Sequence, residues 1–333
     1  MHEQGNRRKH VVVIGTGGTI ASSGADAIDF HNYSVSSTVE QILTAVPEAG
    51  QIARLSSTQP ANVDSFMIDN SVLLAVARAA KDAVQDDAVD GIVITHGTDT
   101  LEETAYFLHL VLPTNKPVVV VGAMRPATAM SADGPLNLFN AILAATNSSS
   151  VQKGVLVVVN GHIYSARDVM KRDTSSIDAI DGGKYGILGE ISGENVNFVH
   201  APVKPHTSNS EFSLFGLDEL PHVDVLFDHQ SAGPHLYEAA LAAGAKGIVV
   251  AGTGNGSLSA GARQGAAYAH DAGIPFIRAS RTGQGIVASL KSDSEHGIIS
   301  ANSLTPQKAR VLAMLAIAHG EGVVGLQDVF DNY

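Results

Sequence analysis

Two short turns rich in threonine and glycine each follow directly on an apolar, β-branched run. The turn at 16–19 (TGGT) follows residues 11–14 (VVVI), and the turn at 95–100 (THGTDT) follows residues 91–94 (GIVI). Parallel strands that are buried on both faces have continuous apolar sequences of this kind. In open α/β sheets, ligands bind just beyond the carboxyl ends of the strands. We therefore predict two strands of one parallel sheet that present hydroxyl groups to a common pocket.

Strand-like runs alternate with helix-like segments through the first half of the chain. The expected strands cover 11–14, 51–55, 91–95, 117–121 and 154–159, and the expected helices cover 37–46, 69–84, 100–111 and 136–146. This alternation is typical of βαβ units and a parallel sheet. Residues 172–200 place closely spaced glycines between short β-prone pieces, which favours hairpins.

A second alternating region follows a segment at 201–222 that is rich in proline, serine and asparagine. Its expected strands cover 223–227, 247–251 and 275–279, and its expected helices cover 234–243, 259–271 and 305–318. We predict an α/β protein with a large N-terminal parallel-sheet domain at 1–205, a linker at 206–222 and a smaller α/β domain at 223–333.

The charge balance and the residue types exclude several classes of function. With 33 acidic and 21 basic residues the formal net charge is −12, which argues against a nucleic-acid partner. The chain has no cysteine, which excludes disulfides, thiol catalysis and cysteine-bound zinc. Its 14 histidines form no His-Glu-x-x-His motif, and the glycines at 15–18 lack the rest of a dinucleotide fingerprint, so we expect no metal and no cofactor.

The sequence contains no apolar run of about 18 residues, and no secretory leader is visible before the first strand. We therefore expect no membrane partner and a cytoplasmic location. A processed periplasmic or secreted form would read the same way.

A threonine in a tight glycine turn can act as a nucleophile when a neighbouring group activates its hydroxyl. A lone Ser or Thr at such a place is more often a helix cap. The second turn favours catalysis, because Thr98 stands beside the carboxylate of Asp99. Lys171 follows a later strand and is a candidate proton carrier, while Tyr33 follows a loop that could close as a lid.

Motifs spread in order along nearly the whole chain resemble those of the bacterial-type L-asparaginases and the related glutaminase-asparaginases. They are residues 16–21 (TGGTIA), 94–105 (ITHGTDTLEETA), 121–126 (VGAMRP), 131–135 (SADGP), 254–256 (GNG) and 306–310 (PQKAR). The resemblance implies a large N-terminal α/β domain, a smaller C-terminal flavodoxin-like domain, and a homotetramer built from two intimate dimers. It also implies hydrolysis of L-asparagine to L-aspartate and ammonia, with minor L-glutamine turnover.

The same resemblance assigns roles to individual residues. Thr19 would be the nucleophile, Tyr33 would orient or activate it, and Thr98, Asp99 and Lys171 would form a second catalytic cluster. The implied substrate-binding residues are Ser65, Phe66, Gly97, Ala123, Asn255 and Ser257. Asp99 would meet the α-ammonium group of the substrate.

Three departures from the family pattern concern substrate binding. Phe66 stands where many relatives carry Gln or Glu, and Ser257 stands where some carry Asn. No counterpart is found for the glutamate that relatives contribute across the dimer interface. We expect weaker binding of the α-amino group or a relaxed substrate range, because a polar group buried without a partner costs about 1–3 kcal/mol.

Two other functions stay open at this point. Asparaginase-like domains also serve as ammonia-supplying subunits of tRNA-dependent amidotransferases, although those carry an additional N-terminal domain. The third alternative is a non-catalytic amino-acid-binding module that has kept the fold.

Overall fold

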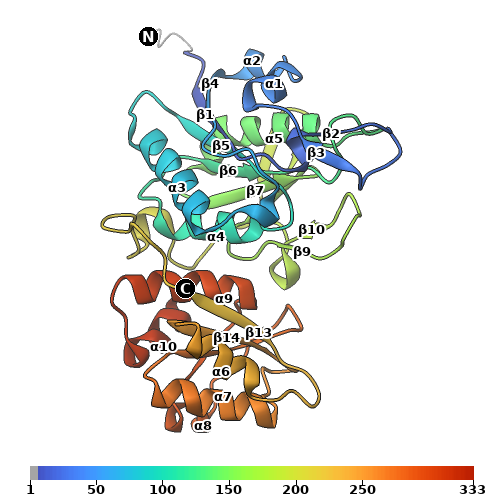
Figure 1. Ribbon diagram of the computed structural model, residues 1–333. Coiled ribbons are helices and arrows are strands. Elements are labelled where there is room, and N and C mark those ends of the chain that lie inside the picture. Colours follow the sequence, from blue (N-terminus) through green and yellow to red (C-terminus); the bar gives the residue numbers. More distant parts are fainter. Residues whose placement is uncertain (1–6) are drawn as a thin grey trace. The chain divides into compact units, whose positions relative to one another are not determined.

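The computed structural model describes residues 7–333, apart from the side chain of Ser294, and divides the chain into two units (Figure 1). The first unit ends at Leu214 and the second is Phe215–Tyr333. The division falls within the segment 206–222, where buried Phe212, Leu214 and Leu217 alternate with exposed residues. Each unit is an α/β structure, as predicted.

The first unit is built on an eight-stranded sheet with the order β12-β11-β8-β7-β6-β5-β1-β4. Its parallel strands are β1 (His10–Gly15), β4 (Arg54–Thr58), β5 (Gly91–Thr95), β6 (Val118–Val121) and β7 (Val155–Val159), and its antiparallel strands are β8 (His162–Ser165), β11 (Gly189–Ser192) and β12 (Asn195–Phe198). Every residue of β5, β6 and β7 is buried, which explains their unbroken apolar sequence.

Helices cover both faces of this sheet. One face packs against α1 (Val39–Thr44), α2 (Ala49–Ile52) and α5 (Gly134–Thr146), whose buried side chains share one core cluster with alternate residues of the central strands. The helices α3 (Asn70–Gln85) and α4 (Leu101–Val111) lie outside that cluster and contact β1, β5 and β7 from the other face (Figure 1).

This arrangement gives the β6–α5–β7 connection the opposite hand to the other crossovers. The chain steps from β5 to β6 and from β6 to β7 in the same direction, yet α4 and α5 lie on opposite faces. Crossovers are right-handed in nearly all proteins, so β6–α5–β7 is a rare left-handed one. Twelve residues, at 122–133, connect β6 to α5 along this path.

The strand order reverses between β1 and β5. From β1 the chain passes to β4 on one side, and it then returns to β5 on the other side, with Gly15 opposite Thr95. Such a reversal leaves a crevice outside the carboxyl ends of the two strands. The turns 16–19 and 95–100 both follow the carboxyl ends of these parallel strands, as the sequence predicted.

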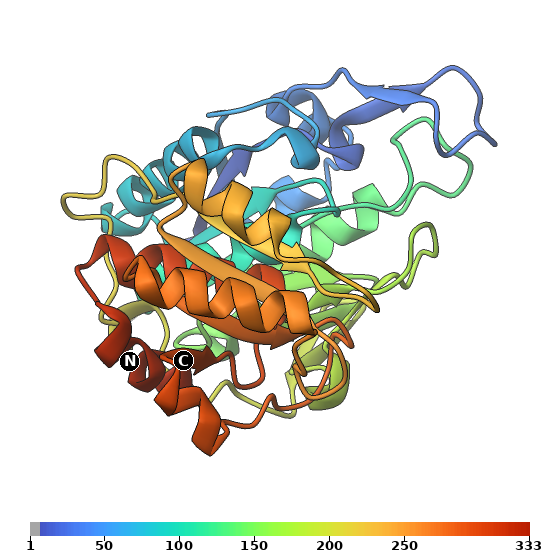
Figure 2. The same cartoon turned by 60° about the horizontal axis from the view of Figure 1, so that its bottom comes forward.

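The second unit has four parallel strands in chain order: β13 (Val223–Phe227), β14 (Gly247–Gly252), β15 (Phe276–Ser280) and β16 (Ile298–Ser300). The helices α6 (His235–Ala242) and α7 (Ala260–Asp271) pack side by side on one face (Figure 2). The long helix α9 (Pro306–Ala318) contacts β13, β14 and β15. The helices α8 (Lys291–Glu295) and α10 (Val323–Asn332) contact β16.

Several elements differ from the expected ones. The strand predicted at 51–55 is wrong in its position, because α2 continues to Ile52 and β4 begins at Arg54. The strand β16 and the helix α10 were not predicted. The hairpins expected within 172–200 are confirmed by the antiparallel pair β11–β12. None of the helices in the described part of the chain is long and apolar enough to cross a membrane.

Candidate active site

Glycines bring the two threonine turns into backbone contact. Gly17 and Gly18 have φ angles of 100° and 76°, which side chains rarely tolerate. A Cβ atom on Gly18 would lie 2.2 Å from the backbone nitrogen of Gly97, and one on Gly17 would lie 2.4 Å from the carbonyl oxygen of Val63. The first turn therefore needs glycine for its conformation and for the close approach of the second turn.

Thr19 begins a short 3-10 helix directly after these glycines and is 7% exposed. Its Oγ1 lies 3.0 Å from the phenolic oxygen of Tyr33, within hydrogen-bond distance. Tyr33 begins β3 (Tyr33–Val35), which pairs with β2 (Ser22–Gly24) in an antiparallel hairpin. Because β2 follows the 3-10 helix, the hairpin returns the chain to Thr19 and brings these two predicted residues together.

The second cluster joins the turn after β5 to a distant strand. Lys171 lies on β9 (Met170–Lys171), which pairs with β10 (Ile180–Asp181). Its Nζ donates to Thr98 Oγ1 at 2.9 Å and to Asp99 Oδ1 at 2.6 Å. Thr98 is buried, whereas the Asp99 side chain is 54% exposed and has room for another cationic partner.

Buried Glu102, near the start of α4, accepts a hydrogen bond from the backbone nitrogen of Lys171 at 3.1 Å. The carboxylate therefore fixes the strand that carries the lysine. The sequence analysis gave Glu102 no role of its own and missed this contact. Its spacing from Asp99, one turn along the chain, was the only available signal.

Ser65 lies against the second turn. It is buried, and its carbonyl oxygen accepts a hydrogen bond from Thr100 Oγ1 at 2.8 Å. A Cβ atom on Gly97 would lie 2.7 Å from Ser65 Oγ, so the serine hydroxyl sits directly over the glycine backbone. Phe66, the next residue, is 65% exposed and takes no part in the core.

Ala123 is fully buried at the start of the loop between β6 and α5. The carboxylate of Asp133 holds this loop by accepting hydrogen bonds from the backbone nitrogens of Met124 and Arg125, each at 2.9 Å. Asn137 adds bonds of 3.1 Å to Asp133 Oδ2 and to the carbonyl oxygen of Gly122. The role of Asp133 was missed, although the residue belongs to the motif at 131–135.

His96 has one defined neutral tautomer within the second turn. Its Nδ1 donates to the carbonyl oxygen of Gly97 at 2.7 Å, so its Nε2 accepts from Thr104 Oγ1 at 2.9 Å. Complete burial lowers the pKa of His96 to about 4. The imidazole is therefore neutral at pH 7 and links the turn to α4.

Asn255 and Ser257 belong to the second unit, in the turn between β14 and α7. The side chain of Asn255 accepts a hydrogen bond from the backbone nitrogen of Ala288 at 3.1 Å. The backbones of Thr253 and Ser257 are hydrogen-bonded to each other in both directions. Both candidates thus stand on a well-bonded turn of their own unit.

The site groups do not form a metal centre. Within residues 7–333 there is no group of three or more histidine, aspartate or glutamate side chains placed to hold an ion. The chemistry that remains is that of two hydroxyls, each next to a proton donor or acceptor, beside a carboxylate.

Comparison with known proteins finds relatives over almost the whole chain. Residues 10–204 match the family model "Asparaginase, N-terminal" and residues 222–330 match "Glutaminase/Asparaginase C-terminal domain". The chain is 44% identical to L-asparaginase 2 of Bacillus subtilis (97% of this chain, 86% of the relative) and 40% identical to the glutaminase-asparaginase of Acinetobacter glutaminasificans (98% and 100%). The crystal structure of a probable cytoplasmic L-asparaginase from Campylobacter jejuni matches with a TM-score of 0.95 and 40% identity (98% and 100%).

Proposed function

The chain belongs to the asparaginase family, and from this we propose that it hydrolyses L-asparagine to L-aspartate and ammonia, with L-glutamine as a minor substrate. The observation that carries the proposal is that two hydroxyl clusters stand on neighbouring turns, which Gly18 and Gly97 bring into backbone contact. Thr19 pairs with Tyr33 in the turn after β1, and Lys171 donates to both Thr98 and Asp99 in the turn after β5. Two such clusters can supply a nucleophile and proton-transfer groups for both steps of an acyl-transfer reaction, the formation of an acyl-enzyme and its hydrolysis.

In the first half, Thr19 Oγ1 attacks the side-chain amide carbon of the substrate, with Tyr33 as its hydrogen-bonding partner. The C–N bond breaks, the hydroxyl proton of Thr19 goes to the leaving nitrogen, and ammonia departs. In the second half, water attacks the acyl-threonine ester, which releases L-aspartate and restores the hydroxyl. Thr98 and Lys171 handle the protons of the departing amine and of the water.

Charge and hydrogen bonding support an α-amino acid as the substrate. The half-exposed carboxylate of Asp99 suits the substrate's ammonium group, and the buried hydroxyl of Ser65 suits its carboxylate. Gly97 and Ala123 supply backbone that frames the amide. We propose Asn255 and Ser257 as further substrate-binding residues.

Phe66 bears on substrate selectivity. An exposed aromatic ring cannot replace the hydrogen bond that Gln or Glu offers at this place in relatives. We expect KM for L-asparagine to fall on Phe66→Gln, whereas kcat changes little, because the lost contact is to a group remote from the reacting carbon. Saturation of the unaltered protein by nanomolar to low-micromolar L-asparagine would contradict a weakened site.

We further propose a homotetramer and a cytoplasmic location. Both rest on family likeness, the second on the description of the Campylobacter jejuni relative. Light scattering of the purified protein tests the first, and fractionation of the native cells tests the second.

Ammonia release from L-asparagine, L-glutamine and their D-isomers tests the main proposal, with Thr19→Ala and Thr98→Ala as variants. We expect each substitution to abolish most of the activity toward the L-amides. Release that needs an added partner chain and tRNA would favour an amidotransferase subunit. Binding of L-asparagine without any ammonia release would favour a binding module, and unchanged release by both variants would refute the assigned residues.

A further inference from the structure

Lys171 lies outside the main sheet of the first unit. The chain leaves that sheet after β8 and returns to it at β11, and between these strands β9 forms a two-stranded sheet with β10. Lys171 stands opposite Ile180 in this pair, and Met170 stands opposite Asp181. A ladder of two residue pairs holds a strand weakly, since an isolated hairpin is at best marginally stable in water. The position of the lysine therefore depends on contacts with other elements.

The backbone N–H of Lys171 needs an acceptor from such an element. Successive residues of an antiparallel strand direct their backbone groups alternately toward the partner strand and away from it. The backbone nitrogen of Arg172 donates to the carbonyl oxygen of Ala179 at 2.7 Å, on the β10 side. The backbone N–H of Lys171 consequently points away from β10, and it donates to Glu102 Oε2 at 3.1 Å.

The helix that carries Glu102 is a fixed reference for this strand. Ten of the eleven residues of α4 are buried, and Glu102 itself is 7% exposed. The acceptors of the lysine Nζ, Thr98 and Asp99, stand directly before the same helix. The backbone and the side chain of Lys171 are therefore both bonded to one short segment, residues 98–102.

A long, flexible side chain makes the place of the backbone important. Lysine has four methylene groups between its backbone and its ammonium, and ordering them costs conformational entropy. A backbone held at the correct distance limits where Nζ of Lys171 can reach. A misplacement of about 1 Å, caused by a change away from the reacting atoms, can lower a rate about 10²-fold.

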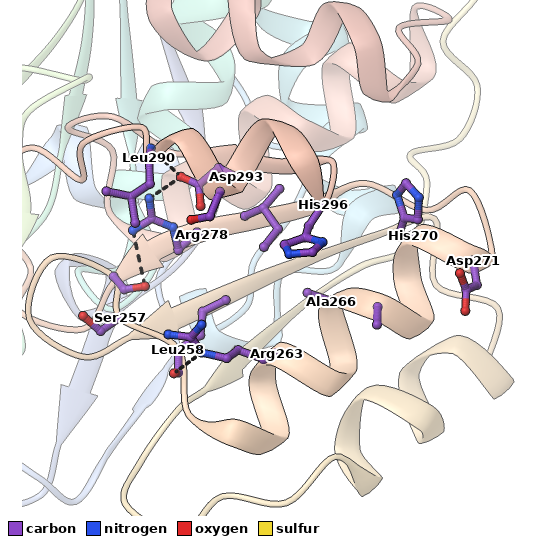
Figure 3. A pocket seen from close by; sticks show the side chains of 14 residues that line it. Ser257, Leu258, Arg263, Ala266, His270, Asp271, Arg278, Leu290, Asp293 and His296 are labelled. Atoms are coloured by element: carbon purple, nitrogen blue, oxygen red, sulfur yellow. Dashed lines mark hydrogen bonds and ion pairs between the residues drawn. The ribbon is translucent and has the colours of Figure 1, made fainter.

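A buried carboxylate of the second unit makes the same type of contact. Asp293 Oδ2 accepts from the backbone nitrogen of Leu290 at 2.8 Å and from Arg278 Nη2 at 2.5 Å (Figure 3). Hydrogen bonds to an ionised acceptor are among the stronger ones in proteins. There the bonds hold α8 against β15, whereas the strand that Glu102 holds carries a lysine of the second threonine cluster.

We propose that Glu102 is a positioning residue for Lys171: its carboxylate fixes the backbone of β9 so that Nζ meets Thr98 and Asp99. The proposal rests on the proposed hydrolysis, in which the lysine handles protons. Glu102 does not touch the reacting atoms and acts through the strand.

A carboxylate in the first turn of α4 also favours the helix through its dipole, a role that Glu103 shares. The two roles make different demands on the side chain. The dipole requires a negative charge, whereas the backbone bond requires an acceptor at the correct distance. Gln at position 102 keeps the distance without the charge, and Asp keeps the charge but withdraws the acceptor by one carbon–carbon bond, about 1.5 Å.

Steady-state ammonia release from L-asparagine by Glu102→Gln and Glu102→Asp separates these roles. We expect Glu102→Asp to lower kcat about 10- to 100-fold with a smaller change in KM, and Glu102→Gln to stay within about threefold of the unaltered protein. Glu103→Gln, the same change at the neighbouring residue, is the matched control and should retain full activity. Melting curves confirm that all three variants fold.

A second background shows whether Glu102 acts through the lysine. Once Lys171→Met has removed the ammonium, Glu102→Asp should cause less than about a twofold further loss of kcat, because the group that it positions is gone. A merely structural defect would lower kcat in both backgrounds. Hydrogen exchange of peptides covering residues 166–173 should become faster in Glu102→Asp and stay unchanged in Glu102→Gln.

Three results would overturn the proposal: full kcat in Glu102→Asp, a loss in Glu102→Gln as large as that in Glu102→Asp, or an undiminished further loss in the Lys171→Met background. Failure of the proposed function has a different signature, because the unaltered protein would then release no ammonia from any amide. Hydrogen exchange, which needs no substrate, would still report whether Glu102 holds the strand.

Discussion

The Nζ of Lys171 lies 2.9 Å from Oγ1 of Thr98, although the two residues are 73 positions apart in the chain. The ammonium group donates to the hydroxyl oxygen, so the hydroxyl proton of Thr98 is free to point toward a substrate or a water. The same ammonium is paired with Asp99 at 2.6 Å. Removal of the charge should therefore disturb both the threonine and the carboxylate.

We expect Lys171→Met to lower kcat for L-asparagine by about 10²–10⁴-fold, the usual contribution of one proton-transfer group. Adding Thr98→Val should cause little further loss, because both changes interrupt one relay. Steady-state ammonia release measures both variants. Lys184→Met, in the short 3-10 helix at 183–185, is the control and should retain full activity. A kcat within threefold of the unaltered protein after Lys171→Met would remove the lysine from the mechanism.

Tyr33→Phe deletes only the hydroxyl that lies 3.0 Å from Thr19 Oγ1. We expect kcat to fall about 100-fold with a small change in KM, since the contact concerns the attacking atom. Tyr185→Phe removes a hydroxyl from a half-exposed tyrosine and serves as the control. If Tyr33→Phe raised KM and left kcat unchanged, the phenol would be a binding group only.

Much of the first unit was predictable because its central strands are buried on both faces. Their β-branched runs identify β1, β5, β6 and β7. The threonine turns follow β1 and β5, where the strand order reverses. The edge strand β4 alternates exposed and partly buried residues and has Leu55 as its only apolar side chain. Its position was therefore wrong by three residues, and the helical turn before it was missed.

The contacts of the loop at 122–133 could not be predicted, because the sequence does not indicate the left-handed path of the chain between β6 and α5. The loop at 122–133, between β6 and α5, meets the β2–β3 hairpin. Gly24 and Thr128 exchange two hydrogen bonds there, of 2.9 and 3.0 Å, across 104 residues. A sequence motif marked the loop at 121–135, but nothing in the sequence indicated what it touches.

This docked hairpin leads to the next prediction. The backbone nitrogens of Ala127 and Met130 donate to Ser22 and Ala27, each at 2.8 Å. The guanidinium of Arg125 lies 5.0 Å from the centre of the Phe30 ring. The loop that ends at Tyr33 is therefore held by the segment that begins at Ala123.

Phe30→Leu should remove one exposed cation–π contact and so lower the free energy that holds this loop in place by about 0.5–1 kcal/mol. We therefore expect KM to rise about two- to fivefold, with a smaller effect on kcat. Hydrogen exchange of peptides covering residues 24–33 should become faster. Ile28→Leu, an exposed position in the same loop, is the control. Unchanged exchange after Phe30→Leu would mean that the ring does not hold the loop.

The last prediction concerns acid stability and His96. Burial holds the pKa of this neutral imidazole at about 4, whereas an unfolded chain has a value near 6.5. At a pH between these two pKa values, the imidazole is protonated in the unfolded state and neutral in the native state. The stabilisation is therefore complete above pH 6.5, and about 3 kcal/mol of it is lost as the pH falls to 4.

His96→Asn removes this titration. We expect the variant to be less stable at pH 7.5, because the bond from Thr104 is lost, but its urea midpoint should fall less steeply between pH 6.5 and 4 than that of the unaltered protein. His31→Asn, at an exposed histidine, should keep the original slope. The imidazole of His96, which is neutral in the native state, must take up a proton between pH 6.5 and 4 once the chain unfolds. Equal slopes for His96→Asn and the unaltered protein would therefore show that another buried group causes the loss of stability in acid.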